Sequence, residues 1–477
     1  MSPFDQARYE RLLKGLEVSE VQLSELNLSD RADAEYVSKE NLRIERLVRH
    51  LPHKKLGSLC ELTASAFYPA ATQLYGGTGT PFVRCVDCID FPLISTLQDE
   101  SFERLPEYFV AAHQSIRSVK KGELVITKVG SPCYASVVHE HAEVALSRTV
   151  LGAVNIRDAD PYYLMVFLRS YHGFSQLMRQ REQTIQFQLT LERVRDVDVF
   201  MPSKAFQQRV AGMARSSFEV LKSGRDALGE AENKLFENLG LDTWRPPEAA
   251  GYFSNSRDVF TAGRLDAEFF APRVAGLLAL LGRDGLTIAD VAPARHDRFT
   301  PALSGSFRYI EIGGLDSDGV SQSEEVPHRH APSRATQYVC AGDVITSTVR
   351  PIRRLSAVIG ADQHHAVCSS GFVVLQPKTV SPEVLLTYLR LRSVCELMDL
   401  HTSATMYPAI SEADLLALPI PNIPETTQRA IEKSVQAARQ AKARATQHLD
   451  AAKRAVEIAI EDSEAAALQF LEALDER

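Results

Sequence analysis

The chain has 477 residues, of which 45% are hydrophobic and 24% are charged, and its formal net charge is −8. This composition is typical of a globular protein with enough apolar residues for two or three cores, and it excludes a fibrous or low-complexity chain. The negative balance also argues against binding nucleic acid through bulk positive charge alone.

The seven cysteines are odd in number and show no framework spacing. This usage predicts reduced thiols in a cytoplasmic protein rather than a disulfide scaffold. The sequence shows no signal-peptide pattern and no apolar run of about 20 residues, the length needed to cross a bilayer. We therefore expect a cytoplasmic protein without a membrane partner.

The first half begins with residues 1–51, where apolar periodicity predicts helices over residues 4–27 and 34–51. Between residues 52 and 202 the pattern changes to short β-rich runs separated by glycine and proline turns, which predicts a β-rich domain. Its expected elements are strands over residues 82–86, 123–129, 135–139 and 144–156, a helix over 161–180 and a last strand from residue 189. A long helix over residues 203–240 is expected to close this half.

The second half restarts the same order after a proline-bearing connector around Trp244. Residues 241–283 are expected to hold this connector and a start helix, and residues 284–421 a second β-rich domain. The expected elements are a helix over residues 265–281, strands over 308–312, 339–349, 355–359 and 367–375, a helix over 382–400 and a closing strand over 415–420. Residues 422–477 are expected to form a long C-terminal helix.

Short segments of the first half recur in the second at a nearly constant offset. Gln428 follows Gln208 by 220 residues (428 minus 208), and Leu385 follows Leu164 by 221 (385 minus 164). The matching pairs are Arg31–Tyr36 with Arg264–Phe269, Gly122–Thr127 with Gly342–Thr346, and Leu164–Arg169 with Leu385–Arg390. We conclude that one unit has been duplicated in tandem.

Both expected long helices carry an apolar seam with alternating steps of three and four residues. The seam positions are Val210, Met213, Ser217, Val220, Ala227 and Ala231 in the first, and Ile431, Val435, Ala438, Ala445, Leu449, Ala452, Val456 and Ala459 in the second, where Lys442 interrupts it. Such a seam needs a partner helix. We expect a mixed α+β fold in which two pseudo-twofold-related β-rich heads are separated by long helices that pair as an antiparallel coiled coil.

The order, spacing and duplication of these motifs resemble the specificity (S) subunits of type I restriction–modification enzymes. The resemblance covers most of the chain. It rests on Tyr309-Ile-Glu-Ile312, Gly342-Asp-Val-Ile-Thr-Ser347, Thr402-Ser-Ala-Thr405 before Ile410, and Leu418-Pro-Ile-Pro421 followed by Gln428. Two features depart from it: the connector near Trp244 is long, and an extra helical segment precedes the first Arg-x-Asp-Ala-Glu.

The resemblance implies two target recognition domains, each reading one half of a bipartite site in double-stranded DNA. It also implies that the helices seat DNA adenine methyltransferase subunits, expected to be two, and that a restriction and translocase subunit is a further partner. In this family S-adenosylmethionine belongs to the methyltransferase, so no cofactor is expected on this chain.

Candidate DNA-binding residues cluster in turns that combine hydroxyl and basic side chains. In the second domain they are Thr346, Ser347, Thr348, Arg350, Arg353 and Arg354 around Pro351, with a further cluster of His328, Arg329 and Arg334. In the first domain they are Lys120, Lys121, Thr127, Lys128 and Ser131, and Thr184 and Thr405 align between the repeats. Guanidinium groups can bind guanine edges or phosphate in bidentate fashion. The plain alternative for each cluster is a solvated charged loop.

Other residue patterns are better explained by structure than by chemistry. Cys85-x-x-Cys88 lacks the second pair of a zinc site, and the repeat places Cys85 opposite Glu311 on a strand, so packing is the preferred interpretation. Asp33 and Glu35, with copies at Asp266 and Glu268, stand at expected helix starts, where acidic residues favour the helix dipole.

Catalytic fingerprints are missing from the sequence. It contains no glycine-rich S-adenosylmethionine loop, no methyltransferase tetrad and no Walker A lysine, so we expect a non-catalytic chain. Two alternatives stay open. One is a metal-dependent nuclease using acids such as Asp87, Asp90 and Glu123, and the other is a protein-binding scaffold of a related phage-defence complex.

Overall fold

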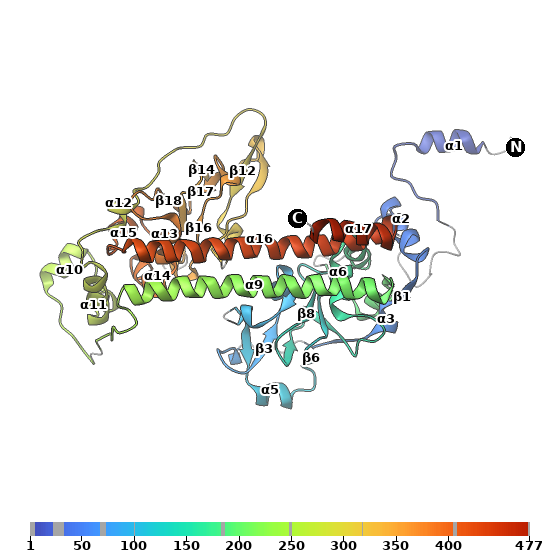
Figure 1. The fold of residues 1–477 in the computed structure, drawn as a ribbon, viewed down its shortest axis with the longest axis horizontal. Helices are drawn as coiled ribbons and strands as arrows, with labels where there is room; N and C mark the ends of the chain where they lie inside the picture. Colours follow the sequence, from blue (N-terminus) through green and yellow to red (C-terminus); the bar gives the residue numbers. More distant parts are fainter. Residues whose placement is uncertain are drawn as a thin grey trace. The chain divides into compact units, whose positions relative to one another are not determined.

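The computed structural model describes residues 5–21, 33–66, 73–99, 101–182, 187–247, 250–316, 318–403 and 408–475. The chain forms two compact units, residues 1–222 with 443–477 and residues 223–442. Each unit holds one β-rich head and part of each of two long helices, α9 (Lys204–Asn238) and α16 (Glu425–Glu461) (Figure 1). The predicted α+β fold is confirmed. No helix in these described ranges is long and apolar enough to span a membrane.

Two sheets build the first head. One has the strand order β5-β3-β9-β6, and the other has the order β2-β10-β7-β8-β4. The strands are β2 (Glu61–Ala64), β3 (Thr80–Val83), β4 (Leu93–Ile94), β5 (Glu103–Leu105), β6 (Ser118–Lys120), β7 (Leu124–Thr127), β8 (Ala135–Val138), β9 (Glu143–Leu146) and β10 (Val150–Val154). Valine, leucine and isoleucine from both sheets fill the core between them, including Val83, Val125 and Val144.

The second head repeats this plan with the sheet orders β13-β12-β17-β14 and β16-β15-β18. Its strands are β12 (Ser306–Ile310), β13 (Glu324–Pro327), β14 (Ala335–Tyr338), β15 (Val344–Ser347), β16 (Ser356–Val358), β17 (Val367–Ser369) and β18 (Phe372–Leu375). In both heads the central pair of the first sheet, β3 with β9 and β12 with β17, is parallel, and its outer pairs are antiparallel. The duplication predicted from the sequence is therefore present in the fold.

Helices occupy matching places in the two halves. The first half has α1 (Gln6–Leu13), α2 (Lys39–Arg49), α3 (Leu56–Leu59), α4 (Val86–Ile89), α5 (Glu107–Ala112), α6 (Pro161–Arg169), α7 (Tyr171–Arg179) and α8 (Leu191–Arg195). The second has α10 (Ser256–Ala262), α11 (Pro272–Leu281), α12 (Ile288–Val291), α13 (Pro382–Arg390), α14 (Arg392–Leu400) and α15 (Glu412–Ala417), and α17 (Glu464–Asp475) follows α16. Short 3-10 helices are η2 (Thr96–Gln98), η3 (Ala267–Phe270), η4 (Ile312–Gly314), η5 (His328–His330), η6 (Pro351–Arg353) and η7 (Ala361–Gln363).

Several predicted helices are wrong in extent. The helices expected over residues 161–180 and 382–400 are each broken in two, because Ser170 and Leu391 have extended backbones. The Ser170 hydroxyl accepts the N–H of Gly173 and so caps α7. The start helix of the second half begins only at Pro272, since proline suits the first turn of a helix. Within the described residues, α1 is the helical part of the segment expected over 4–27, and residues 22–27 lie outside them.

The closing strand predicted over residues 415–420 is also wrong. Its first residues belong to α15, which starts at Ser411 because this hydroxyl accepts the N–H of Asp414. Pro419 makes a single bridge to Thr287. In the first head the corresponding place is a short sheet of β1 (His53–Lys55) and β11 (Asp198–Phe200), so chain entry and exit lie together there. A further small hairpin, β19 (Thr402–Ser403) with β20 (Ala409–Ile410), corresponds to a single antiparallel bridge between Glu182 and Gln188 in the first head.

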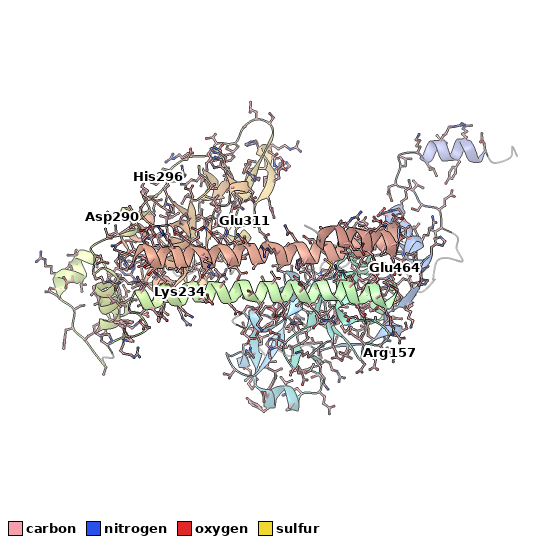
Figure 2. All side chains as sticks on the ribbon, viewed as in Figure 1. Arg157, Lys234, Asp290, His296, Glu311 and Glu464 are labelled. Carbon is pink, nitrogen blue, oxygen red and sulfur yellow. The ribbon has the colours of Figure 1, made fainter. Side chains whose placement is uncertain are left out.

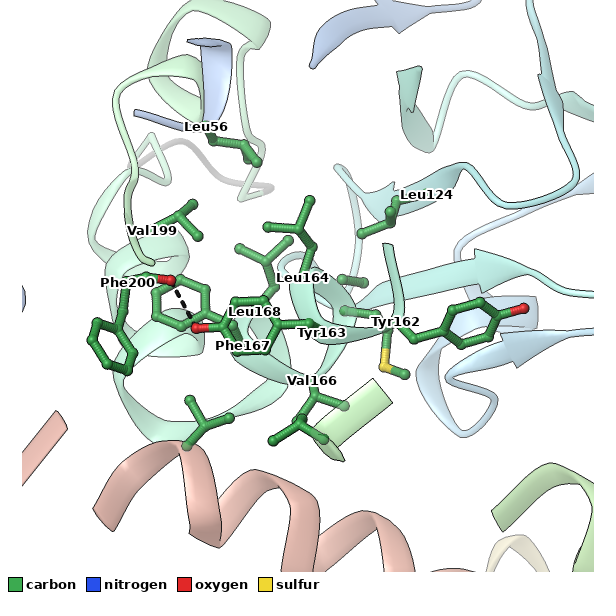
Figure 3. Packing of buried hydrophobic residues seen from close by; sticks show 14 of the residues in the cluster. Leu56, Leu124, Tyr162, Tyr163, Leu164, Val166, Phe167, Leu168, Val199 and Phe200 are labelled. Atoms are coloured by element: carbon green, nitrogen blue, oxygen red, sulfur yellow. Dashed lines mark hydrogen bonds between the residues drawn. The ribbon is translucent and has the colours of Figure 1, made fainter. Parts of the chain in front are cut away.

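The core of the first unit is centred on α6, which is buried along almost its whole length (Figure 3). Tyr163 is fully buried, and its hydroxyl donates a 2.7 Å hydrogen bond to the carbonyl of Phe200 in β11. A buried tyrosine with a satisfied hydroxyl adds a large apolar contact without an unpaired polar group. This bond ties the helix of the head to its exit strand.

The long helices pack against each other in each unit. In the first unit, Val210 of the predicted seam and its α9 neighbours Ala211, Ala214 and Phe218 share one core with Ala452, Ala455, Val456, Ala459 and Ile460 of α16. Ser217 Oγ donates to the carbonyl of Ala445 at 2.8 Å, and Ser203 N donates to Glu464 at 2.9 Å. Earlier residues on α9 thus meet later residues on the partner, so the pair is antiparallel, as predicted.

The second unit continues the seam with Ala231 and Leu235 against Ile431 and Val435. Here Gly224 allows a close approach, because a Cβ atom at this position would lie 2.8 Å from the Cβ of Ala441. The small residues at this crossing explain why the helices can pair without large side chains over this stretch.

A glutamine at the start of each long helix holds its entry to the head. Gln207 donates to the carbonyl of Pro202 at 3.0 Å, and Gln428 donates to the carbonyl of Ile423 at 3.0 Å. Each amide oxygen also accepts the N–H of the residue that caps the buried head helix, α6 or α13. The sequence comparison paired Gln208 with Gln428, and the structure corrects this to Gln207.

Lys442, which interrupts the seam, serves to attach the second head to α16. Its Nζ atom contacts a carboxylate oxygen of Asp316 and lies 2.8 Å from Asp318, which is also paired with Arg225 of α9 at 2.8 Å. Burial alone would raise the pKa of Asp318, but Lys442 and Arg225 lower it below its usual value. The carboxylate of Asp318 therefore joins the head to both long helices within the second unit.

We expect Lys442→Met to lower the free energy of unfolding of the second unit by about 2 kcal/mol, between the values for exposed and buried ion pairs. Because the pKa of Asp318 is lowered in the folded chain, the pair stabilises above the ordinary carboxylate pKa, and the loss should shrink below about pH 4. Denaturant unfolding at pH 7 and pH 3.5 measures both effects. Exposed Lys433→Met is the control, and an equal effect in it would contradict the assignment.

Candidate nucleic-acid interface

The turn between β15 and β16 carries the residues predicted to read DNA in the second head. Its hydroxyls face inward: Thr346 Oγ1 lies 2.7 Å from Ser356 Oγ, and Thr348 Oγ1 donates to the carbonyl of Gly371 at 3.1 Å. Ser347 is buried, and its hydroxyl donates to the carbonyl of Val349. These three side chains shape the turn and do not form its outer surface.

The three arginines of this turn have different surroundings. Arg354 is held inside the unit, where Nε donates to the carbonyl of Arg390 at 2.6 Å and the guanidinium pairs with Glu232 of α9. Arg353 ends η6 with an exposed side chain. Arg350 is half-buried and has a left-handed backbone with φ of 52°, and its N–H donates to the carbonyl of Pro408. Of the three, Arg353 is the most exposed to a ligand.

The equivalent turn of the first head lies between β7 and β8 and shares two backbone features with it. Gly130 and Cys133 have positive φ, as Arg350 and Arg354 do at the matching positions. Thr127 is buried, and its hydroxyl accepts the N–H of Tyr134 at 2.9 Å. The remaining predicted residues keep solvent access: Lys120, Lys121 and Ser131 are exposed, and Lys128 is half-buried.

The polar cluster around η5 lies beside the first sheet of the second head. His328 stacks on Phe299 with ring centroids 5.8 Å apart, and its Nδ1 accepts the N–H of Ala302 at 3.1 Å. Arg329 and Arg334 flank it with exposed side chains. An aromatic platform with exposed guanidinium groups on either side can stack on bases or bind phosphate.

Further charged groups lie on the same head. Arg308 is exposed on β12 and donates to the carbonyl of His364 at 3.1 Å. His296, labelled in Figure 2, lies 3.4 Å from Glu412. Thr184 and Thr405, which align between the repeats, lie outside the described residues.

Two buried arginines were missed as such in the sequence, although they end the matched segments of the repeat. Arg169 donates to the carbonyls of Ala135, Ile89 and Cys88, with N–O distances of 2.5 and 3.1 Å for the first two. Burial lowers its pKa to about 10. Arg390 similarly donates to the carbonyl of Arg354 at 3.0 Å. Both brace the turn that carries the candidate reading residues.

The alternative chemical sites are not assembled. Cys85 precedes α4 rather than lying on a strand, and its thiol donates to the carbonyl of Ser131 at 3.2 Å. Burial raises the pKa of Cys88 to about 12, which disfavours the thiolate that a metal needs. Asp87 is paired with Arg84 at 3.2 Å, and Glu123 accepts the N–H groups of Lys120 and Asn155.

The paired carboxylates near the repeat starts are local turn formers. Asp33 accepts the N–H of Tyr36 at 3.1 Å. The guanidinium of Arg264 lies 2.8 Å from Asp266 and lowers the pKa of that carboxyl. Neither arrangement needs a metal or a substrate.

No family model and no curated protein matches the sequence. Among solved structures, the chain is similar to the S subunit of a type I restriction–modification system from M. genitalium, with 12% identity and a TM-score of 0.37 over 86% of this chain and 94% of that chain. It is also similar to the HsdS subunit from Thermoanaerobacter tengcongensis, with 16% identity and a TM-score of 0.27 over 87% and 96% of the two chains. The type IIG restriction endonuclease BpuSI matches over 38% of this chain, at 10% identity and a TM-score of 0.30.

Proposed function

We propose that this chain is the non-catalytic DNA-specificity subunit of a type I-like restriction–modification complex that acts in phage defence. The observation that carries the proposal is the duplication. Two heads with the same pairing in their four-stranded sheets each present a braced basic turn at the same place, and each packs against part of the antiparallel helix pair. Such a pair of readers fits a DNA target made of two half-sites.

In this proposal the partners follow from the family resemblance. Double-stranded DNA contacts the heads, and two DNA adenine methyltransferase subunits sit on the helices and carry S-adenosylmethionine. A restriction and translocase subunit can join them in the cytoplasm. The exposed basic residues supply the phosphate and base contacts despite the net charge of −8, because they gather at defined places.

Mapping methylated adenines in host DNA, with and without this gene, tests the proposal and reveals the target. A bipartite methylated sequence should disappear with the gene. The reassembled complex should then bind that sequence with an affinity that falls as salt rises. Metal-dependent cleavage by the isolated chain would support the nuclease alternative, and assembly without salt-dependent DNA binding would support the scaffold.

Within the second head we expect Arg353 to contact a base. Arg353→Ala should cost about 1–3 kcal/mol in binding of the cognate duplex and relax the choice at one base pair. A phosphate contact would instead weaken all duplexes alike and lower the salt slope by about one. Binding to cognate and single-base-altered duplexes across salt separates these results.

Arg392→Ala is the matched control, because Arg392 is exposed on α14 and pairs only loosely with Glu396 at 3.4 Å. Arg354→Ala should act on stability rather than on base choice, since Arg354 is bound to Glu232. If Arg353→Ala binds like the unaltered chain, this turn does not read DNA. The cluster of His328, Arg329 and Arg334 is then the next surface to alter.

A further inference from the structure

We propose that Cys340, His364 and His365 form a binding site for a divalent transition metal ion of the zinc class. The thiol sulfur and one ring nitrogen of each histidine lie within 4.8 Å of one another. A thiolate with two imidazoles is a ligand set that zinc favours, whereas calcium and magnesium prefer oxygen. In the part of the chain that the structure describes, no other group of three potential ligands meets this spacing.

The backbone holds the two ligand-bearing turns in place. The N–H of Cys340 donates to Asp343 at 2.7 Å, and Asp343 is bound by Arg295 through two contacts of 2.8 and 3.1 Å. On the other turn, the N–H of His365 donates to the carbonyl of Val339 at 2.9 Å. The ligands are thus brought together by the fold and do not depend on chance side-chain positions.

The histidines are arranged in a way that ordinary packing does not require. His365 has a left-handed backbone with φ of 59°, a conformation that costs energy for a non-glycine residue. The two rings lie with centroids 4.2 Å apart, and both side chains are exposed. His364 Nδ1 accepts the N–H of Ala341 at 3.2 Å, so its lone pair faces the cysteine turn. A metal bound at this nitrogen would replace that one hydrogen bond.

The first head provides an internal comparison. In the two sheets, Tyr338 lies opposite Val367 as Ser118 lies opposite Ala145. Counting along the strands, Lys120 stands at the position of Cys340, and Glu143 stands at that of His365. Lys120 and Glu143 lie directly opposite each other, which shows that these two positions are neighbours across the sheet.

The supporting turn is also common to both heads. The N–H of Lys120 donates to Glu123 at 2.8 Å, as that of Cys340 does to Asp343. The scaffold is therefore duplicated, and the metal ligands belong to the second head alone. A bound ion would join the turn before β15 to the turn before β17, and three protein ligands leave a fourth position open.

The site is tested by titrating the full, untagged and reduced chain with zinc in a calorimeter. A parallel titration with cobalt(II) reports thiolate bonding through its absorption spectrum. We expect one ion per chain, with affinity reduced by about 100-fold or more in Cys340→Ser and in His365→Ala, since even outer-shell changes cost 10- to 100-fold. The cobalt–thiolate band should vanish in Cys340→Ser.

His330→Ala is the control, because His330 is an exposed histidine on η5, outside the cluster. It should bind zinc as the unaltered chain does. The proposal is overturned if the unaltered chain binds zinc no more tightly than Cys340→Ser, or if His330→Ala loses as much affinity as His365→Ala. The test does not involve DNA, so its outcome is independent of the proposed function.

Discussion

Replacing Val435 with aspartate is expected to lower the free energy of unfolding of the second unit by about 4 kcal/mol or more. Val435 is 1% exposed and packs in one core with Ile431, Ala231 and Leu235 at the seam of α9 and α16. A carboxylate there would lose its hydration among the apolar side chains of this core. Denaturant unfolding, monitored by the circular dichroism signal of the helices, measures this loss of free energy.

The matched control is Ala437→Asp, two residues further on the same helix and exposed. It introduces the same charge into the same helix without burying it, so its effect should stay within about 0.5 kcal/mol. Equal unfolding midpoints for both variants would contradict the pairing of α9 with α16 at Val435. Loss of assembly with the proposed methyltransferase partner only in Val435→Asp would show that the paired helices are also needed for assembly.

The second large effect is expected on replacing Arg169 with alanine. The change removes the guanidinium donor from the carbonyls of Ala135 and Ile89, whereas the carbonyl of Cys88 keeps the hydroxyl of Ser136. Each unsatisfied group costs about 1–3 kcal/mol, so we expect the first unit to lose about 4 kcal/mol. Arg390→Ala should also destabilise the second unit, because Arg390 donates to the carbonyl of Arg354, just before β16.

Arg392→Ala serves again as the control, because its side chain is 86% exposed. Thermal unfolding of the three variants decides between a bracing and a surface role. A change in melting temperature for Arg169→Ala no larger than that for Arg392→Ala would show that the buried arginine does not brace its turn.

Some parts of this architecture could be predicted from the sequence because they depend on local rules. The duplication was visible because Gly122 and Gly342, both at positive φ, stand two residues before the same strand in each head, β7 and β15. The helix seam was visible because buried positions such as Val210 and Val456 follow the three-and-four spacing of one helix face. Such patterns survive in a single sequence.

Other features depend on tertiary contacts that no local pattern reveals. Thr346 and Thr127 looked like surface hydroxyls, and both are buried with internal partners. The break at Ser170 was hidden because serine also fits inside a helical pattern. Lys442 interrupts the apolar seam in the sequence, and in the structure it forms ion pairs with Asp316 and Asp318 of the head.

The buried arginines could have been found from the sequence. Arg169 and Arg390 each follow a nearly unbroken apolar run at the end of a matched segment. A charged residue repeated at the end of a buried helix has to be paired with something inside the protein. The repeat identified these positions, and only the structure revealed their acceptors.

The second head can be exchanged as one piece, because its two ends lie together. Asn422 N donates to Asp284 at 2.8 Å, and Ile420 N donates to the carbonyl of Leu286 at 3.0 Å. Replacing residues 284–421 by the second head of a type I restriction–modification S subunit therefore breaks the chain at two neighbouring points. The first head and its parts of the helices keep their contacts with one another, and the new head has to replace contacts such as that of Asp318 with Lys442.

Mapping methylated adenines in a host that carries this hybrid chain is the most direct test of two independent readers. If each head reads its own half-site, one half of the bipartite methylated sequence changes to that of the donor and the other half stays the same. A change in both halves at once, or a methylated sequence that is unaltered in both, would contradict it.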